Sequence, residues 1–268
     1  MDKIGKSVYV NITGRGCNNS LVATSDGIVM IDTPMFPADA TAVREEISRL
    51  GVLRYIVNTE PHVDHVSGAY FFDAPVIGHE GTRKAVMDAS VDQYRDMLKR
   101  TDPQTTLPDG FAYRPASITL TERMTLYLGK HTFELIHLPG HSPFQVAVFV
   151  PEERVIFTSD NVTNGTPPFM HQALPFEWVD SLKKMQKLEA DRLVPGHGPI
   201  ADRAYLAEMI TIIEGATDAV QSAIKKGLTL EEAQTSVKLF PRFPANERMI
   251  QVQKMSIARL YDVLRARI

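Results

Sequence analysis

The chain has 268 residues, 44% hydrophobic and 23% charged, with a formal net charge of −3. A chain of this length can bury one large core, so we expect a single domain over residues 1–268, whose helical C-terminal part begins at about residue 201. This near-neutral charge composition gives no indication of the clustered basic face that nucleic-acid binding requires. No stretch of the sequence approaches the roughly 20 apolar residues of a membrane span. We therefore expect a small-molecule substrate, with no nucleic-acid and no membrane partner.

The N-terminal stretch MDKIGKSVYV lacks the apolar core of a secretory signal. Cys17 is the one cysteine of the sequence, so no internal disulfide can form. Both observations favour a cytoplasmic, reducing location. Cys17 lies in the Gly- and Asn-rich turn GRGCNNS, and no catalytic role is expected for it.

Short apolar runs between turn residues predict the elements of the first half. Strands are expected at 7–13, 19–24 and 27–33, followed by a helix at about 38–50 whose apolar residues recur on one face. The run at 53–59 is nearly continuously apolar, which is typical of a strand covered on both sides. A strand at 75–79, a helix from 80, and a polar helix-and-loop segment at about 90–116 complete this half.

A second β-rich half follows the same plan. Strands are expected at 117–122, 124–129, 131–138, 145–150 and 154–160, then a helix at 175–190, a short strand at 192–196, and helices from 201 to the end. Two similar halves of strands and helices predict two sheets face to face with helices outside.

The most informative string is TEPHVDHVSG, which directly follows the strand at 53–59. Alternate residues of an extended segment point the same way, so Glu60 and His62 can converge on one ion. Asp64 and His65, at the following turn, can face a second ion. One histidine after a strand is more often structural than a metal ligand, but four residues of ligand type within six positions favour a metal site.

Three further strings have the same character: PGHS contains His141, TSDN contains Asp160 and PGHG contains His197. Each of these residues is expected just past an apolar strand, where side chains from several strand ends can meet. Together the candidates offer four imidazoles and three carboxylates. That inventory is enough for two ions that share a bridging carboxylate and a bridging water or hydroxide.

The order of these strings resembles the metallo-β-lactamase superfamily, in particular glyoxalase II-like metallo-hydrolases, with a variant ExHxDH motif in place of HxHxDH. The resemblance implies an α/β fold, the four-layer αββα sandwich, with the site along one edge of the sheets. It also implies a role for each candidate: His62 and His141 bind the first metal, Asp64, His65 and His197 bind the second, Asp160 bridges them, and Asp32 supports the metal loop.

Glu60 departs from the family pattern, which has histidine at this position. Either Glu60 remains a ligand, or it has left the first site, which is then weak or empty. We favour the ligand, because a glutamate reaches where the histidine ring would lie and a metal offsets its charge. Carboxylate favours iron or manganese more than imidazole does. Two divalent ions with three carboxylates leave a charge of +1 (+4 − 3), so the site is expected to be a weaker Lewis acid.

Two functions are compatible with this inventory. In the first, a metal-bound hydroxide cleaves an ester, lactone, thioester or amide of a small molecule, Asp64 orients the nucleophile, and the two divalent ions are zinc, with iron or manganese as alternatives. In the second, the same ligands hold two irons for oxygen-using redox chemistry, as the resemblance of this ligand total to flavodiiron proteins implies. We expect the hydrolase.

The segment after Asp160 is expected to border the substrate, which makes Phe169, Met170 and His171 candidate substrate contacts. His137 ends the strand that leads into PGHS, and we expect it to support the ligands from behind. The helices after residue 200 carry enough apolar positions for a homodimer contact.

Overall fold

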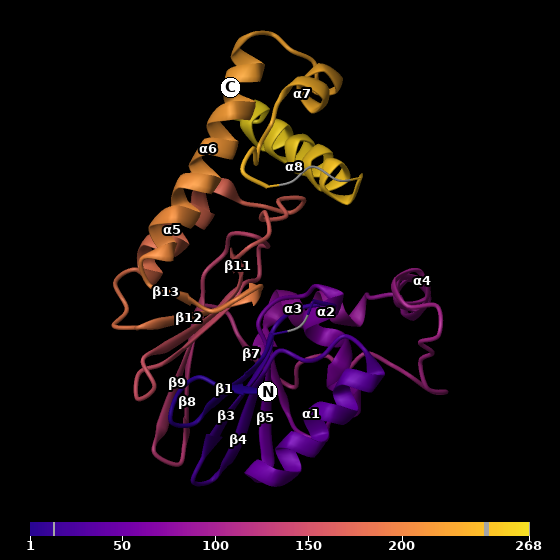
Figure 1. The fold of residues 1–268 in the computed structure, drawn as a ribbon, viewed down its shortest axis with the longest axis vertical. Helices are drawn as coiled ribbons and strands as arrows, with labels where there is room; N and C mark the ends of the chain where they lie inside the picture. The colour runs from indigo at the N-terminus through magenta and orange to yellow at the C-terminus, as the bar shows by residue number, and fades with distance from the viewer. Residues whose placement is uncertain (13, 244–246, 268) are drawn as a thin grey trace.

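A computed structural model describes residues 1–12, 14–243 and 247–267 of the protein, and in it two β-sheets face each other between helices (Figure 1). Strands of the first sheet lie in chain order: β1 (Asp2–Lys3), β2 (Val8–Asn11), β3 (Asn19–Thr24), β4 (Gly27–Ile31), β5 (Leu53–Asn58), β6 (Val76–His79) and β7 (Ile118–Leu120). Strands β1 to β4 pair antiparallel, and β4 to β7 pair parallel. The carboxyl ends of β4, β5 and β6 therefore lie along one edge of the sheet.

The second sheet has the order β13-β12-β11-β10-β9-β8. Its strands are β8 (Arg123–Leu128), β9 (His131–His137), β10 (Val146–Val150), β11 (Val155–Thr163), β12 (Arg192–His197) and β13 (Ala201–Asp202). Neighbours pair antiparallel except β11 and β12, which run parallel. The carboxyl ends of β11 and β12 therefore also lie at one edge.

Helices flank the sheets and join their strands. In the first half they are α1 (Pro37–Leu50), α2 (Val63–Val66), the 3-10 helix η1 (Ser67–Phe71), α3 (Glu80–Met87) and α4 (Val91–Thr101). In the second half they are α5 (Pro175–Met185), α6 (Tyr205–Lys225), α7 (Leu230–Ser236) and α8 (Glu247–Arg265). Among the described residues, no helix combines the length and the hydrophobicity needed to cross a bilayer.

The burial of β4 explains its unbroken apolar sequence. Val29 and Ile31 belong to the core between the two sheets, together with Phe133 and Val148 of the second sheet. The alternate residues of β4 belong to the core beneath α1. Both faces of the strand are therefore covered, as the αββα arrangement requires, and the sandwich expected from the sequence is confirmed.

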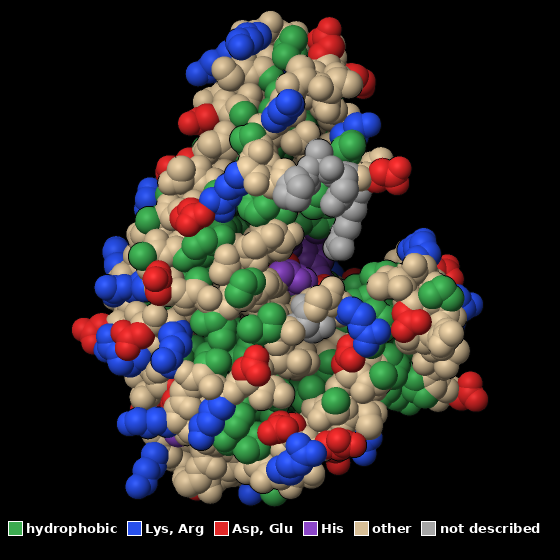
Figure 2. Space-filling model, viewed as in Figure 1, with side chains coloured by type: hydrophobic (Ala, Val, Ile, Leu, Met, Phe, Trp, Pro, Cys, Tyr) green, Lys and Arg blue, Asp and Glu red, His purple; other side chains and the backbone are tan. Residues whose placement is uncertain are grey.

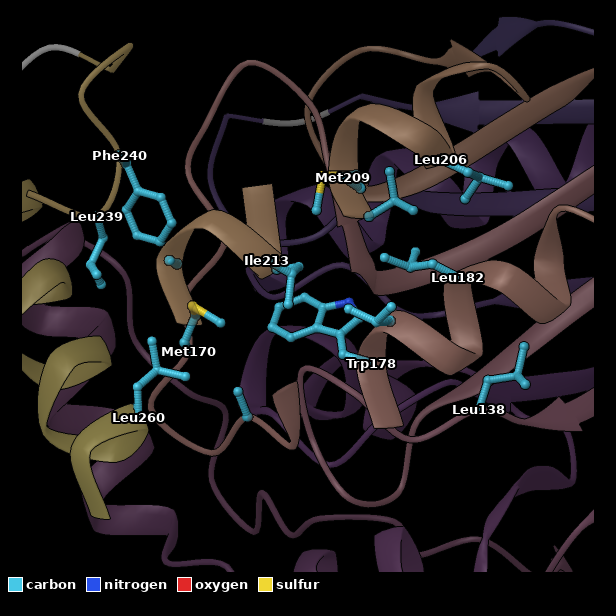
Figure 3. Packing of buried hydrophobic residues seen from close by; sticks show 14 of the residues in the cluster. Leu138, Met170, Trp178, Leu182, Leu206, Met209, Ile213, Leu239, Phe240 and Leu260 are labelled. Carbon is cyan, nitrogen blue, oxygen red and sulfur yellow. The ribbon is translucent and has the colours of Figure 1, made fainter. Parts of the chain in front are cut away.

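The C-terminal helices share one core with the outer face of the second sheet. Trp178 of α5 is fully buried among residues of α6, and Leu260 of α8 lies in the same cluster (Figure 3). The helical part begins at Tyr205, directly after the short strand β13, close to the expected boundary at residue 201. In Figure 1 helices α6, α7 and α8 extend beyond the sheets on the side of β11.

Candidate metal centre

The string TEPHVDH leaves β5 in an extended conformation and then turns into α2. His62 is the N-cap of this short helix, with φ −66° and ψ 148°, and Asp64 lies in its first turn. Glu60 and His65 are fully buried. The extended segment followed by a turn is the local structure that the spacing of the motif predicts.

Three residues of the second half lie at the same edge. His141 lies in the loop between β9 and β10, and His197 is the last residue of β12. Asp160 was expected where its strand ends, but the strand β11 continues to Thr163, so Asp160 lies within it. Pairing between β11 and β12 is irregular on both sides of Ser159, which has a φ of 51°. This β-bulge redirects the strand where Asp160 reaches the site.

Glu60, His62 and His141 form what we call the first cluster. Oε2 of Glu60 lies 3.0 Å from Nδ1 of His62, which lies 3.2 Å from Nε2 of His141. Oε1 of Glu60 lies 3.9 Å from the same nitrogen of His141. One ligand atom from each residue lies within 4.8 Å of the others, a separation at which a metal ion can be held.

Asp64, His65 and His197 form the second cluster, which meets the same criterion. Oδ2 of Asp64 lies 3.3 Å from Nε2 of His197 and 4.0 Å from Nε2 of His65. Each cluster thus offers two imidazoles and one carboxylate.

Asp160 lies between the two clusters. Its Oδ1 is 3.3 Å from Nε2 of His65, and its Oδ2 is 3.3 Å from Nε2 of His197 and 3.6 Å from Nε2 of His141. Gly196 makes room for it, because a Cβ at that position would lie 1.8 Å from Oδ1 of Asp160. The structure therefore brings all seven expected residues together.

Asp32 lies beneath the second cluster. Its Oδ2 accepts a hydrogen bond from Nδ1 of His65 (2.9 Å) and another from the Thr59 hydroxyl (2.6 Å), while its Oδ1 accepts from the Thr59 backbone amide (2.8 Å). Because His65 donates its Nδ1 proton in this way, its Nε2 is directed at the cluster as the atom available to a metal ion. The Thr59 hydroxyl is also hydrogen bonded to that of Ser159 (2.6 Å), which connects the two sheets below the site.

The buried carboxylates shift the pKa values of the imidazoles strongly. Burial by itself lowers the pKa of His62, but Glu60 raises it to about 9. Burial likewise lowers the pKa of His197, and Asp160 with Asp64 raises it to about 11. Without a metal these nitrogens hold protons, and a divalent cation competes for the same lone pairs.

Unsatisfied polar atoms provide a test of whether ions fit. Both carboxylate oxygens of Glu60, Oδ1 of Asp160 and Nε2 of His65 are buried, without a hydrogen-bond partner among the described residues. Buried charged oxygens that lack donors are costly. Two divalent ions among carboxylates and imidazoles would satisfy all of these atoms, so the site fits a pair of metal ions.

Two of the three candidate substrate contacts remain available to a ligand. The Phe169 ring stacks on His171 with centroids 4.0 Å apart, and the His171 ring lies 5.0 Å from that of His62. Met170 is fully buried in the core that includes Leu260 of α8 (Figure 3). The expectation that Met170 contacts substrate is therefore not met. Figure 2 shows histidine side chains at the bottom of a hollow between the C-terminal helices and the lobe around α4.

His137 acts on the loop that carries His141. Its Nε2 donates to the backbone carbonyl of Pro143 (2.9 Å), and its ring packs against that of His79 with centroids 4.3 Å apart. His137 thus contacts the ligand loop through the backbone two residues past His141.

Sequence reasoning missed three supporting residues. Asn161 accepts from the backbone amide of His141 (2.9 Å) and donates to the carbonyl of Leu138 (2.6 Å). Asn18 donates from its side chain to the carbonyls of Pro195 (3.0 Å) and Gly198 (2.7 Å), on either side of His197. Cys17 donates to the carbonyl of Asp64 (3.0 Å). The Asn in TSDN was a signal that could have been read, since Asn side chains often hold loops.

A family model described as the metallo-beta-lactamase superfamily matches residues 12–197. The chain is 22% identical to a linear primary-alkylsulfatase from Pseudomonas sp. (strain ATCC 19151), over 90% of this chain and 54% of that protein. It is 25% identical to an acyl-coenzyme A thioesterase from Gallus gallus, over 56% of this chain and 58% of that protein. The chain thus spans little more than half the length of these relatives.

Among solved structures, a metallo-beta-lactamase family protein from Thermus thermophilus superposes with a TM-score of 0.72 at 18% identity. The match covers 97% of this chain and 94% of that one. At this identity the likeness concerns the fold, and it includes the C-terminal helices as well as the two sheets.

Proposed function

Because the chain belongs to the metallo-β-lactamase superfamily, we propose that it is a hydrolase that uses two divalent metal ions to cleave an ester-type bond in a small molecule. The observation that supports this most directly is the pair of two-imidazole, one-carboxylate clusters with Asp160 between them. Members of this superfamily bind divalent metal ions, typically zinc.

The seven residues have distinct roles in this proposal. Glu60, His62 and His141 hold the first ion, Asp64, His65 and His197 hold the second, and Asp160 contacts both. Ions held there would polarise a substrate oxygen, and zinc would lower the pKa of a bound water from 15.7 to about 7.

Asp64 has a further role at the entrance of the site. Its carboxylate is partly exposed, whereas that of Glu60 is fully buried. The pKa of Asp64 stays well below its usual range despite burial, because the imidazoles of His65 and His197 stabilise the charged form. An ionised carboxylate at this position accepts a hydrogen bond from a water and orients it toward the substrate carbonyl.

Among the expected substrate classes, we favour esters and thioesters over lactones and amides. The relatives are named as an alkylsulfatase and an acyl-coenzyme A thioesterase, and both names refer to ester-type substrates. Phe169 and His171 form an aromatic wall beside His62, which suits an acyl or alkyl group next to the scissile bond.

A redox function is the second candidate, and the donor set supports it. Two imidazoles and one carboxylate per ion form the ligand type that non-haem iron(II) oxygenases use. Two such sets joined by a carboxylate are compatible with two irons and oxygen chemistry.

Metal substitution under strict anaerobiosis separates the two functions. We expect zinc- or manganese-loaded protein to cleave at least one substrate in a panel of chromogenic esters, thioesters, lactones, amides and alkyl sulfates without oxygen. His62→Ala and His197→Ala should each lose most of that rate, whereas His131→Ala, remote from the clusters, should retain it. Turnover that requires both iron and oxygen would replace the hydrolase with the redox function.

A further inference from the structure

The Glu60 carboxylate faces both clusters. Its Oε2 lies 3.0 Å from Nδ1 of His62, in the first cluster, and its Oε1 lies 3.1 Å from Nε2 of His65, in the second. Glu60 also satisfies the metal-site distance criterion twice, once with His62 and His141 and once with His65 and Asp160. A ligand of the first ion alone would need just one of these sets.

This placement parallels that of Asp160. The Asp160 carboxylate also faces both clusters. Its Oδ1 lies 3.3 Å from Nε2 of His65, and its Oδ2 lies 3.3 Å from Nε2 of His197 in the second cluster and 3.6 Å from Nε2 of His141 in the first. Both carboxylates therefore lie against His65 and His141. Their side chains come from different sheets, since Glu60 follows β5 and Asp160 lies in β11.

Burial makes a one-oxygen role for Glu60 unfavourable. The side chain is fully buried, and neither oxygen has a hydrogen-bond partner among the residues that the structure describes. Once Nε2 of His65, 3.1 Å away, is engaged by the second ion, coordination of the first ion by Oε2 alone would leave Oε1 as a buried charged oxygen without a donor, which is costly. A second ion at Oε1 removes that cost.

We propose that Glu60 bridges the two metal ions, as a second bridging carboxylate beside Asp160, rather than serving as a terminal ligand of the first ion. The inference rests on the proposed two-metal function. It also accounts for the departure from histidine at this position. An imidazole offers one nitrogen to one ion, whereas a carboxylate offers one oxygen to each of two ions.

Each ion can be isolated by removing one ligand of the other cluster. His62→Ala leaves the second cluster intact, and His197→Ala leaves the first intact. Into each background we would introduce Glu60→Gln, which preserves shape and removes the charge. The dissociation constant of the remaining Zn²⁺ ion is measured by competition with a chromogenic chelator, with circular dichroism to confirm folding.

If Glu60 bridges the two ions, Glu60→Gln should weaken metal binding in both backgrounds. We expect the Zn²⁺ dissociation constant to rise about tenfold or more in each background, because even residues behind the ligands contribute about 10- to 100-fold to metal affinity. Weakening in the His197→Ala background alone would make Glu60 a terminal ligand of the first ion and overturn the bridge. Weakening in the other background alone, or in neither, would overturn it too.

Glu60→His in the otherwise unchanged chain gives an independent readout. The introduced imidazole can coordinate the first ion but not both. We therefore expect the first ion to bind about as tightly as in the unmodified protein, and the second to bind at least about tenfold more weakly. Two ions of unchanged affinity would overturn the bridge while leaving the two-metal hydrolase intact. An unmodified protein that binds fewer than two ions would instead overturn the proposed function itself, and the bridge with it.

Discussion

Asp160 lies within 3.6 Å of imidazole nitrogens from both clusters. Its removal should therefore affect two ions rather than one. We predict that Asp160→Ala, reconstituted with excess metal and then desalted, retains less of both ions, as measured by elemental analysis. Asp180→Ala is a matched control, since Asp180 is exposed on α5. Retention of both ions by Asp160→Ala would contradict the role of Asp160 as a ligand shared by both ions.

His171 is neutral at pH 7, because burial first, and then the neighbouring His62 and His141, lower its pKa to about 4. A neutral imidazole next to the first cluster can hydrogen bond a substrate without repelling the ions. We predict that His171→Ala keeps its metal content but loses about 10-fold or more in kcat/KM, which corresponds to one lost hydrogen bond to a polar substrate group. Gln172→Ala, at an exposed neighbour, should change neither quantity. Loss of an ion from the His171→Ala variant would show that His171 supports metal binding rather than substrate binding.

At the scale of elements, Asn161 of β11 holds the loop that carries His141. Its side chain satisfies the buried amide of His141 and the carbonyl of Leu138, while its own carbonyl accepts from Nε1 of Trp178 (3.0 Å). We predict that Asn161→Ala lowers the free energy of unfolding by about 1–3 kcal/mol, because it leaves buried backbone groups unpaired. Denaturant titration measures this loss.

The same substitution should act unequally on the two ions. We expect affinity for the first ion to fall about tenfold, as for other residues that orient a ligand, with affinity for the second unchanged. Stepwise chelator competition measures both affinities in one protein, so the second ion serves as the internal control. Equal weakening of both ions would mean that Asn161 acts through general stability.

Most elements could be predicted from local patterns. The helix expected at about 38–50 spans Pro37–Leu50, and the strand expected at 19–24 spans Asn19–Thr24. The ligands could be identified because their residue types recur after strands. The continuation of β11 beyond Asp160 could not be predicted, because the irregular pairing at Ser159 depends on the neighbouring strand β12. The burial of Met170 was missed for a similar reason, since its partners come from helices far along the chain.

At the scale of the whole molecule, the metal-free protein should respond to pH through its clusters. The pKa values of His62 and His197 are raised from the ordinary value of 6.5 to about 9 and about 11. Groups with raised pKa values stabilise the fold fully below the unfolded value, and this contribution is lost as the pH rises through the folded value. We predict that the melting temperature of chelator-treated protein falls steadily between pH 7 and pH 10.

Metal-loaded protein is the control for this prediction, because ions occupy the nitrogens that otherwise bind protons. At pH 8 its melting temperature should be higher than that of the metal-free protein, because metal binding stabilises the folded state. Between pH 7 and pH 10 its melting temperature should also vary less than that of the metal-free protein. Differential scanning calorimetry of both forms across this range makes the comparison. A metal-free form that becomes more stable as the pH rises would contradict the assigned protonation of His62 and His197.

The ligands come from both halves of the chain, and this has a consequence for how the protein is made. Glu60, His62, Asp64 and His65 follow β5. In the second half, His141 lies in the loop between β9 and β10, and Asp160 and His197 lie in β11 and β12. A ribosome releases the N-terminal half first, when the first cluster still lacks His141 and the second lacks His197. In the proposed two-metal site, the donors of the first ion are complete only after residue 160 has been synthesised, and those of the second only after residue 197. If the two ions bind as proposed, the two halves of the chain must therefore have come together in the correct arrangement before either ion has all of its donors.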